Sequence, residues 1–93
     1  MKHNDNEGTL YEMIPRKVNN DKEVIFYTET FSSNEQYKKI LVKENEKHYC
    51  MILDKKELID EYGKFKGIKY KVLWRDKVIY IRDWHLGNQV ENI

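Results

Sequence analysis

The strongest constraint on the fold is a pair of strand-like runs near the C-terminus, GIKYKVLW and VIYIRDW. Both are rich in β-branched and aromatic residues, which is typical of strands, and the short spacing between them predicts an antiparallel hairpin. A two- or four-residue loop around Asp76 and Lys77 pairs Trp74 with Ile79. The pleat then sorts the side chains onto two faces.

The two faces of this hairpin differ in chemistry. The face expected to point toward the core is mostly apolar and holds Ile68, Tyr70, Val72, Trp74, Ile79, Ile81, Asp83 and His85. The outer face is basic with interleaved aromatic residues and holds Lys69, Lys71, Leu73, Arg75, Val78, Tyr80, Arg82 and Trp84. In this register Lys71 lies opposite Arg82, a like-charge pair that costs on the order of 0.2–1 kcal/mol. An anionic partner would offset that cost.

A three-residue loop is the alternative register. It would pair Val72 with Tyr80 and Lys71 with Ile81, so that each face would mix apolar and charged groups. That arrangement buries less apolar surface for the same length of chain, so we favour the first register.

The charge of the chain is concentrated in the same region. The net charge is +1, but residues 64–82 contain seven basic groups and one acidic group. Basic side chains interleaved with aromatic ones can bind phosphate or carboxylate groups. The candidate partner-binding residues are Lys69, Lys71, Arg75, Tyr80, Arg82 and Trp84. The alternative is that Lys and Arg only solvate the outer face and cover its aromatic residues.

Upstream of the hairpin the pattern predicts further strands. The segment TLYEMIPRKV alternates loosely, and Pro15 either ends this strand or places it at a sheet edge. A turn at 19–21 leads to a second strand at 23–31, and KHYCMIL at 47–53 forms a strand.

Two segments carry helix signals. Ser32 and Glu35 match a capping box, so residues 32–46 form either an amphipathic helix or a strand that pairs with 47–53 about a turn near Asn45. We favour the hairpin. Residues 54–63 are expected to form a short helix that begins at Asp54 and ends at Gly63.

The expected fold class is therefore α+β. It is a mainly antiparallel sheet of five or six strands with one or two short helices packed on one face. The domain spans 9–86, between a disordered tail at 1–8 and a C-terminal tail at 87–93.

Composition excludes several classes of protein. No apolar run approaches the length of a membrane span, and the polar N-terminus lacks a signal peptide, so we expect a soluble, cytoplasmic protein. The single cysteine, Cys50, agrees with a reducing compartment. His48 and Cys50 share a strand face, but a mid-strand thiol is usually a small buried hydrophobe. We expect no catalytic residues, no metal and no cofactor.

The stretch IKYKVLWRDKVIYIRDWH resembles the C-terminal hairpin of the RelE/ParE toxin superfamily over about twenty residues. The resemblance implies an RNA-cleaving activity, with Arg82 and His85 at positions that are functional in some members. The chain departs from that family because residues 9–31 read as two strands, where the family has a strand followed by a long αα-hairpin.

These observations favour a small non-enzymatic binding protein, an inhibitor or adaptor that engages a macromolecular partner through the basic, aromatic hairpin. Lys, Asn, Ile and Tyr supply 38 of the 93 residues, which suggests a low-GC bacterium or one of its phages or mobile elements. The expected partner has an acidic surface, and a protein is favoured over nucleic acid. Pairing of an edge strand with a second copy is a further possibility.

Overall fold

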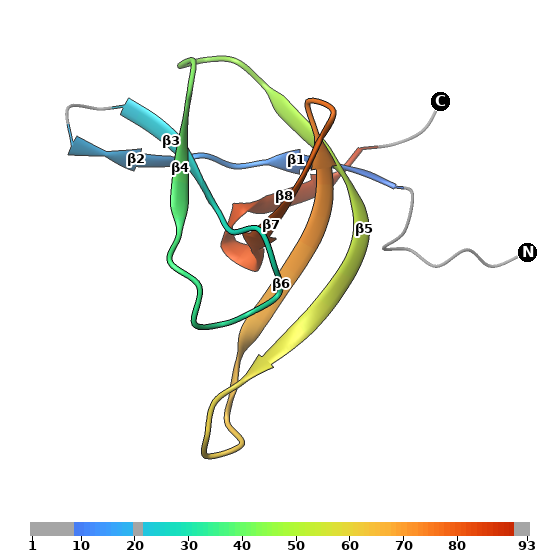
Figure 1. Cartoon of the computed structure of the whole chain (residues 1–93). Coiled ribbons are helices and arrows are strands. Elements are labelled where there is room, and N and C mark those ends of the chain that lie inside the picture. The colour runs from blue at the N-terminus through green and yellow to red at the C-terminus, as the bar shows by residue number, and fades with distance from the viewer. Residues whose placement is uncertain (1–8, 20–21, 91–93) are drawn as a thin grey trace, which may run out of the picture.

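The computed structural model describes residues 9–19 and 22–90, and within these ranges the chain forms strands and 3-10 structure but no α-helix. The expected N-terminal tail, part of the turn at 19–21 and the last three residues lie outside the described residues. The elements in order are β1 (Leu10–Met13), β2 (Arg16–Val18), β3 (Lys22–Tyr27), β4 (Lys38–Val42), β5 (His48–Ile59), β6 (Phe65–Trp74), β7 (Lys77–Arg82), η2 (Asp83–His85) and β8 (Leu86–Gln89) (Figure 1).

The strands form two antiparallel sheets. The larger has the order β7-β6-β5-β1-β8 and the smaller the order β2-β3-β4. Pro15 lies between β1 and β2, where the chain leaves one sheet and enters the other. Because proline has no N–H to donate, the ladder ends there, which confirms that Pro15 ends the first strand. Thr28 and Tyr80 exchange two backbone hydrogen bonds of 2.9 and 3.0 Å and link the end of β3 to β7.

The core lies between the two sheets. Ile25 of β3 packs there against buried residues of the larger sheet, which are Met13, Cys50, Ile52, Val72, Trp74, Ile79 and Ile81. The apolar face predicted for the C-terminal hairpin is confirmed, because its residues are buried or half-buried.

His85 ties the two sheets together from η2. Its side chain is fully buried, Nε2 accepts a hydrogen bond of 2.9 Å from the Phe26 N–H, and Nδ1 lies 2.7 Å from the Ile14 carbonyl oxygen. Since Nε2 is an acceptor, the proton is on Nδ1 and is donated to Ile14. Burial lowers the pKa of His85, and the nearby positive charge of Arg16 lowers it further.

The predicted helix at 54–63 is wrong, and with it the α+β class. β5 continues to Ile59 and pairs with β6, with Leu58 opposite Gly67. The Asp54 carboxylate accepts a hydrogen bond from the next residue's N–H, and Gly63 has a φ of 81° in the turn between the strands. Capping signals are worth about 1 kcal/mol each, less than a long stretch of strand pairing contributes.

The segment 32–46 contains strand β4, so the helix alternative is wrong. The predicted partner is also wrong, because β4 pairs with β3, with Ile40 opposite Ile25, and not with β5. Ser32 and Glu35 form no capping box. The Ser32 hydroxyl accepts a hydrogen bond from the Asn34 N–H, and the Glu35 carboxylate accepts one from the Glu29 N–H. The structure also places β8 in the segment expected as a tail, paired with β1.

The hairpin between β6 and β7 has a two-residue turn. Val72 lies opposite Ile79 and Trp74 opposite Lys77, so the predicted pairing of Trp74 with Ile79 is wrong by two residues. Arg75 and Asp76 occupy the turn with φ values of 52° and 60°, which matches the left-handed geometry of a tight hairpin. A shift of two residues preserves the side-chain faces, so the predicted division of inner and outer residues holds within β6 and β7. It is wrong for Trp84, which lies in η2 and contacts Phe26 of the three-stranded sheet.

Candidate functional site

The outer face of the five-stranded sheet is divided into a covered half and an open half. The covering segment, residues 28–37, runs from β3 to β4 and crosses the hairpin of β6 and β7 near Lys69 and Tyr80 (Figure 1). Phe31 packs edge-on against Tyr80 with ring centroids 4.8 Å apart. Two of the predicted binding residues therefore lie beneath the protein's own chain.

Lys69 is a structural contact of the covering segment. Only 1% of the residue is exposed, and Nζ donates a hydrogen bond of 2.8 Å to the carbonyl oxygen of Ser32. The ammonium also lies 5.6 Å from the centre of the Tyr37 ring. Burial lowers the pKa of Lys69, and the carboxylate of Glu35 opposes that shift. Lys69 anchors the covering segment and is not available to a partner in this arrangement.

Arg82 lies opposite Lys69 and is held near the turn of the β5–β6 hairpin. Its Nη2 donates a hydrogen bond of 2.6 Å to the carbonyl oxygen of Lys66, and among the described residues its buried Nε has no hydrogen-bond partner. The guanidinium passes close to Gly67, where an added Cβ would lie 2.5 Å from Nη2. A hollow of about 710 Å³ borders this side chain and is lined by Ser33, Asn34, Tyr37, Leu58, Ile59, Asp60, Glu61, Lys66 and Arg82.

Arg75 lies in the β6–β7 turn, away from Arg82. Its guanidinium lies 4.6 Å from the centre of the Trp74 ring and 3.3 Å from both the Glu46 carboxylate and Nδ1 of His48. The contact with Glu46 is exposed, so it contributes little to stability.

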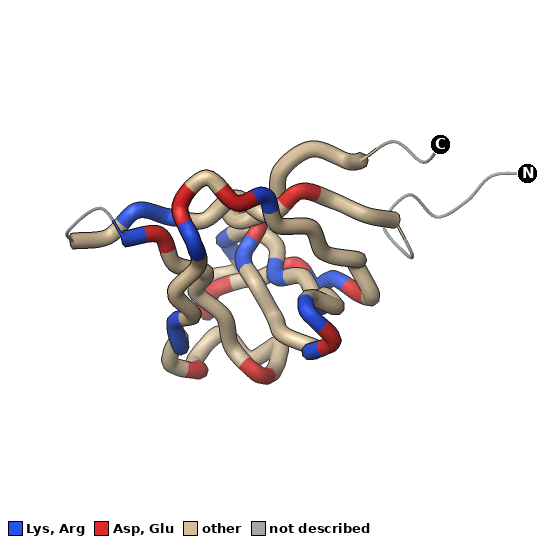
Figure 2. The backbone as a smooth tube through the Cα atoms, turned by 90° about the horizontal axis from the view of Figure 1, so that it is seen from above, with Lys and Arg blue, Asp and Glu red and all other residues tan. Residues whose placement is uncertain are grey.

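Trp84 lies beside the three-stranded sheet. The Arg16 guanidinium is 4.8 Å from the centre of its ring, and Phe26 packs against it with centroids 6.2 Å apart. The six predicted residues thus do not form one surface: Lys71 and Tyr80 are direct neighbours, and Trp84 belongs to another face. Along the described backbone, positions of Lys and Arg are interspersed with positions of Asp and Glu (Figure 2).

The open half of the outer face carries a row of apolar side chains across four strands. Val78 of β7 lies opposite Leu73 of β6, Leu73 opposite Met51 of β5, and Met51 opposite Leu10 of β1. Leu10, Leu73 and Val78 are 37%, 36% and 48% exposed. Tyr49, two residues from Met51, extends the row and is 43% exposed. We call these five residues the apolar row.

Sequence reasoning found only part of the apolar row. Leu73 and Val78 were expected on the outer face of the hairpin, but Leu10, Tyr49 and Met51 were not recognised as their neighbours. Because Tyr49 and Met51 alternate with buried Cys50, the sequence already indicates that both lie on the same face of their strand. That this face lies next to Leu73 depends on how β1, β5 and β6 pair, which the sequence does not indicate.

A lysine flanks the apolar row on the hairpin side. Lys71 lies two residues before Leu73 on the same face of β6, whereas Lys77 pairs with buried Trp74 and lies on the other face. Across residues 9–19 and 22–90, no carboxylate lies within 4 Å of the Lys71 ammonium. On the β1 side Glu12 is 3.8 Å from Lys47.

His48 and Cys50 are both buried on the inner side of β5. Burial raises the pKa of Cys50 to about 12, so the thiol stays protonated at neutral pH. Burial and the charge of Arg75 lower the pKa of His48, and its Nε2 has no hydrogen-bond partner among the described residues. In the described part of the chain, no three His, Cys, Asp or Glu residues are grouped as a metal site would require.

The contacts of His85 bear on the resemblance to RelE/ParE toxins. Both ring nitrogens are engaged by backbone groups and the side chain is fully buried, so His85 does not face solvent. The αα-hairpin of that family is also missing from the described residues.

Comparison with protein-family models, curated proteins and solved structures gave no match. Over the part of the chain that the structure describes, no helix has the length and apolar character needed to cross a membrane.

Proposed function

We propose that this protein is a small non-enzymatic binding domain that docks one protein partner on the open half of the outer sheet face. The observation that carries this proposal is the apolar row, which runs in register across four neighbouring strands. An antiparallel sheet with one solvated face normally carries polar side chains there. A contiguous exposed apolar patch instead marks a protein interaction site.

The covered half of the same face supports this proposal. There the chain packs its own residues 28–37 on the sheet, with Phe31 against Tyr80 and Ser32 over Lys69. Part of the outer face thus already serves as a packing surface within the protein. The apolar row is the adjoining part without such a cover among the described residues.

The charged border specifies the partner further. Lys71 lies beside Leu73 on the same face of β6 without an ion-pair partner in the described chain. A protein with an apolar patch bordered by Asp or Glu fits both features, since complementary charge at the rim speeds association. The role of an inhibitor or adaptor in the cytoplasm belongs to the same proposal.

Leu73→Glu tests the apolar row. It places a charge at its centre, and Ile59→Glu is the matched control because Ile59 is 55% exposed near the far end of β5. Proteins captured from a low-GC bacterial host extract by wild type and both variants are quantified, and the best candidate is purified and titrated. We expect one protein to bind wild type and Ile59→Glu directly and Leu73→Glu at least about tenfold more weakly, a difference of about 1.4 kcal/mol.

Three results would contradict the proposal. The first is a candidate that binds Leu73→Glu as tightly as wild type, and the second is that no candidate binds directly. The third is a concentration-dependent dimer of wild type in sedimentation that Leu73→Glu abolishes, since a second copy would then occupy the face. Circular dichroism and melting temperature confirm that both variants are folded.

A further inference from the structure

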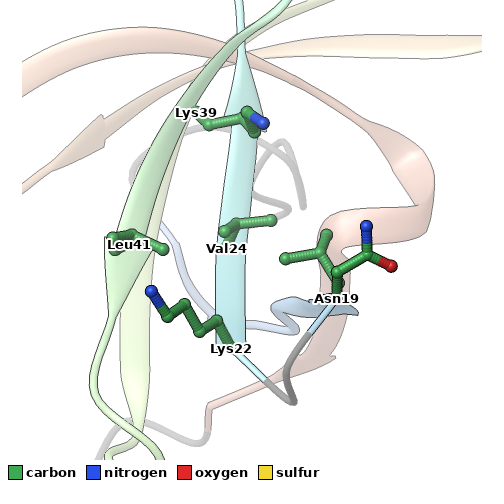
Figure 3. A pocket seen from close by; sticks show the side chains of 6 residues that line it. Asn19, Lys22, Val24, Lys39 and Leu41 are labelled. Atoms are coloured by element: carbon green, nitrogen blue, oxygen red, sulfur yellow. The ribbon is translucent and has the colours of Figure 1, made fainter.

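The outer face of the three-stranded sheet carries a second surface, independent of the apolar row. A hollow of about 470 Å³ lies on it, lined by Val18, Asn19, Lys22, Val24, Lys39 and Leu41 (Figure 3). Val24 forms its centre, and Lys22 and Lys39 lie at opposite ends (Figure 3). Leu41, the most exposed part of its apolar lining, is 62% exposed.

The register extends this hollow toward Trp84. Leu41, Val24 and Arg16 lie opposite one another on β4, β3 and β2, so their side chains share one face. Lys39 lies opposite Phe26, whose ring contacts Trp84. The surface therefore combines an aliphatic floor with an aromatic end.

Positive charge dominates this face. The charged side chains that β2, β3 and β4 place on it are Arg16, Lys22 and Lys39, all basic within the described residues. Glu23 pairs with Lys17 and Val42, which places it on the opposite face. A concave surface on which all charged side chains are positive attracts a polyanion.

The two lysines are too far apart to hold one small anion. Lys39 lies opposite Phe26, which is four residues along β3 from Lys22. At about 3.4 Å per residue the separation along the strand is roughly 13 Å. The two ammonium groups would therefore contact different negative charges of an extended polymer.

Trp84 and Arg16 supply a platform for planar groups. The indole is 38% exposed, and Phe26 and His85 pack against it with ring centroids 6.2 and 4.4 Å away. The Arg16 guanidinium lies over the indole and is itself exposed. Unpaired nucleobases stack on aromatic rings and on guanidinium planes.

We propose that this face binds single-stranded nucleic acid, with phosphates at Arg16, Lys22 and Lys39 and a base stacked on the Arg16–Trp84 pair. An acidic protein segment would satisfy the lysines but not the stacking platform, so nucleic acid fits more of the observed groups. This activity goes beyond the protein-docking function and uses a different sheet.

Fluorescence anisotropy with a labelled fifteen-nucleotide oligo(dT) or oligo(rU) tests the proposal between 50 and 200 mM KCl. Three phosphate contacts predict a slope of log K against log salt of about −2. Lys22→Gln/Lys39→Gln leaves one phosphate contact, so the slope should become shallower, at about −0.7. Binding at 50 mM salt should weaken by roughly 10- to 100-fold. The control Lys55→Gln/Lys64→Gln has the same net charge, alters exposed lysines of the β5–β6 hairpin, and retains wild-type binding.

Tryptophan fluorescence gives a second measurement. Trp74 is only 3% exposed, so quenching by the oligonucleotide reports on Trp84 and is expected to disappear in Trp84→Phe. Absence of binding at 50 mM salt, or equal loss in the two lysine double variants, would overturn the proposal. Equal affinity for poly-glutamate of similar length would also overturn the proposal, because the face would then accept any polyanion. Leu73→Glu is expected to leave oligonucleotide binding unchanged, which separates this proposal from the docking function.

Discussion

The ammonium of Lys69 donates a hydrogen bond of 2.8 Å to the carbonyl oxygen of Ser32, which lies 37 positions away in the sequence. This contact fixes the covering segment on the sheet and thereby sets the border of the open half. A charged hydrogen bond of this kind contributes about 1.5–3 kcal/mol.

Replacing Lys69 is expected to loosen residues 28–37. Lys69→Ala should lower the free energy of unfolding by about 1–3 kcal/mol and speed amide exchange in this segment, because both the bond to Ser32 and the aliphatic stem are lost. Lys69→Met keeps most of the stem and should recover stability but not exchange protection. Lys71→Met, which alters the half-buried neighbour on the same face, is the control and should leave the exchange of 28–37 unchanged.

Acid is expected to destabilise the protein through its buried histidines. The folded-state pKa values of His85 and His48 are lowered, so the unfolded chain binds these protons more readily than the folded chain. Stability is then complete above the unfolded value of about 6.5 and falls as the pH drops below it, by up to about 1.4 kcal/mol per pH unit for each histidine. Urea unfolding between pH 8 and 5 measures this slope.

Single variants show how much each histidine contributes to the pH dependence of stability. His85→Gln should remove the larger part of this pH dependence, since a proton on Nε2 of His85 would face the Phe26 N–H. His48→Gln should remove the rest of it. An equal pH dependence in wild type and His85→Gln would show that His85 is protonated without cost.

The thiol of Cys50 is expected to react only when the protein opens. The residue is 1% exposed, and burial raises its pKa to about 12. At pH 8 the native protein should therefore react with a disulfide reagent far more slowly than free cysteine, at a rate that rises with urea. A rapid reaction without denaturant would contradict the buried placement of Cys50.

Two glycines of the β5–β6 hairpin are expected to differ in their tolerance of alanine. At Gly63, with a φ of 81° and no atom within 4 Å of an added Cβ, alanine should cost about 1 kcal/mol from backbone strain alone. At Gly67, with a φ of 113°, alanine should cost about 2–4 kcal/mol because it also displaces Arg82 from the Lys66 carbonyl. Denaturant unfolding compares the two variants, and equal costs would show that the Arg82 contact contributes nothing.

The alternation of side chains within each strand could be predicted from the sequence. Because the pleat has a period of two, Val72, Trp74, Ile79 and Ile81 were correctly placed inside, even though the register was wrong by two residues. Pro15 likewise marked a strand end through its missing N–H. These properties depend only on neighbouring residues.

The partners of the strands were decided by the tertiary structure. Capping patterns at Asp54 and Ser32 are local signals, and the pairing of β5 with β6 and of β4 with β3 outweighs them. The burial of Lys69 depends on a segment more than thirty residues away, and the apolar row depends on the register of four strands. The sequence by itself therefore determined on which face of the hairpin the side chains of β6 and β7 lie. Only the three-dimensional packing decided what lies above it, because contacts between distant strands leave no local pattern.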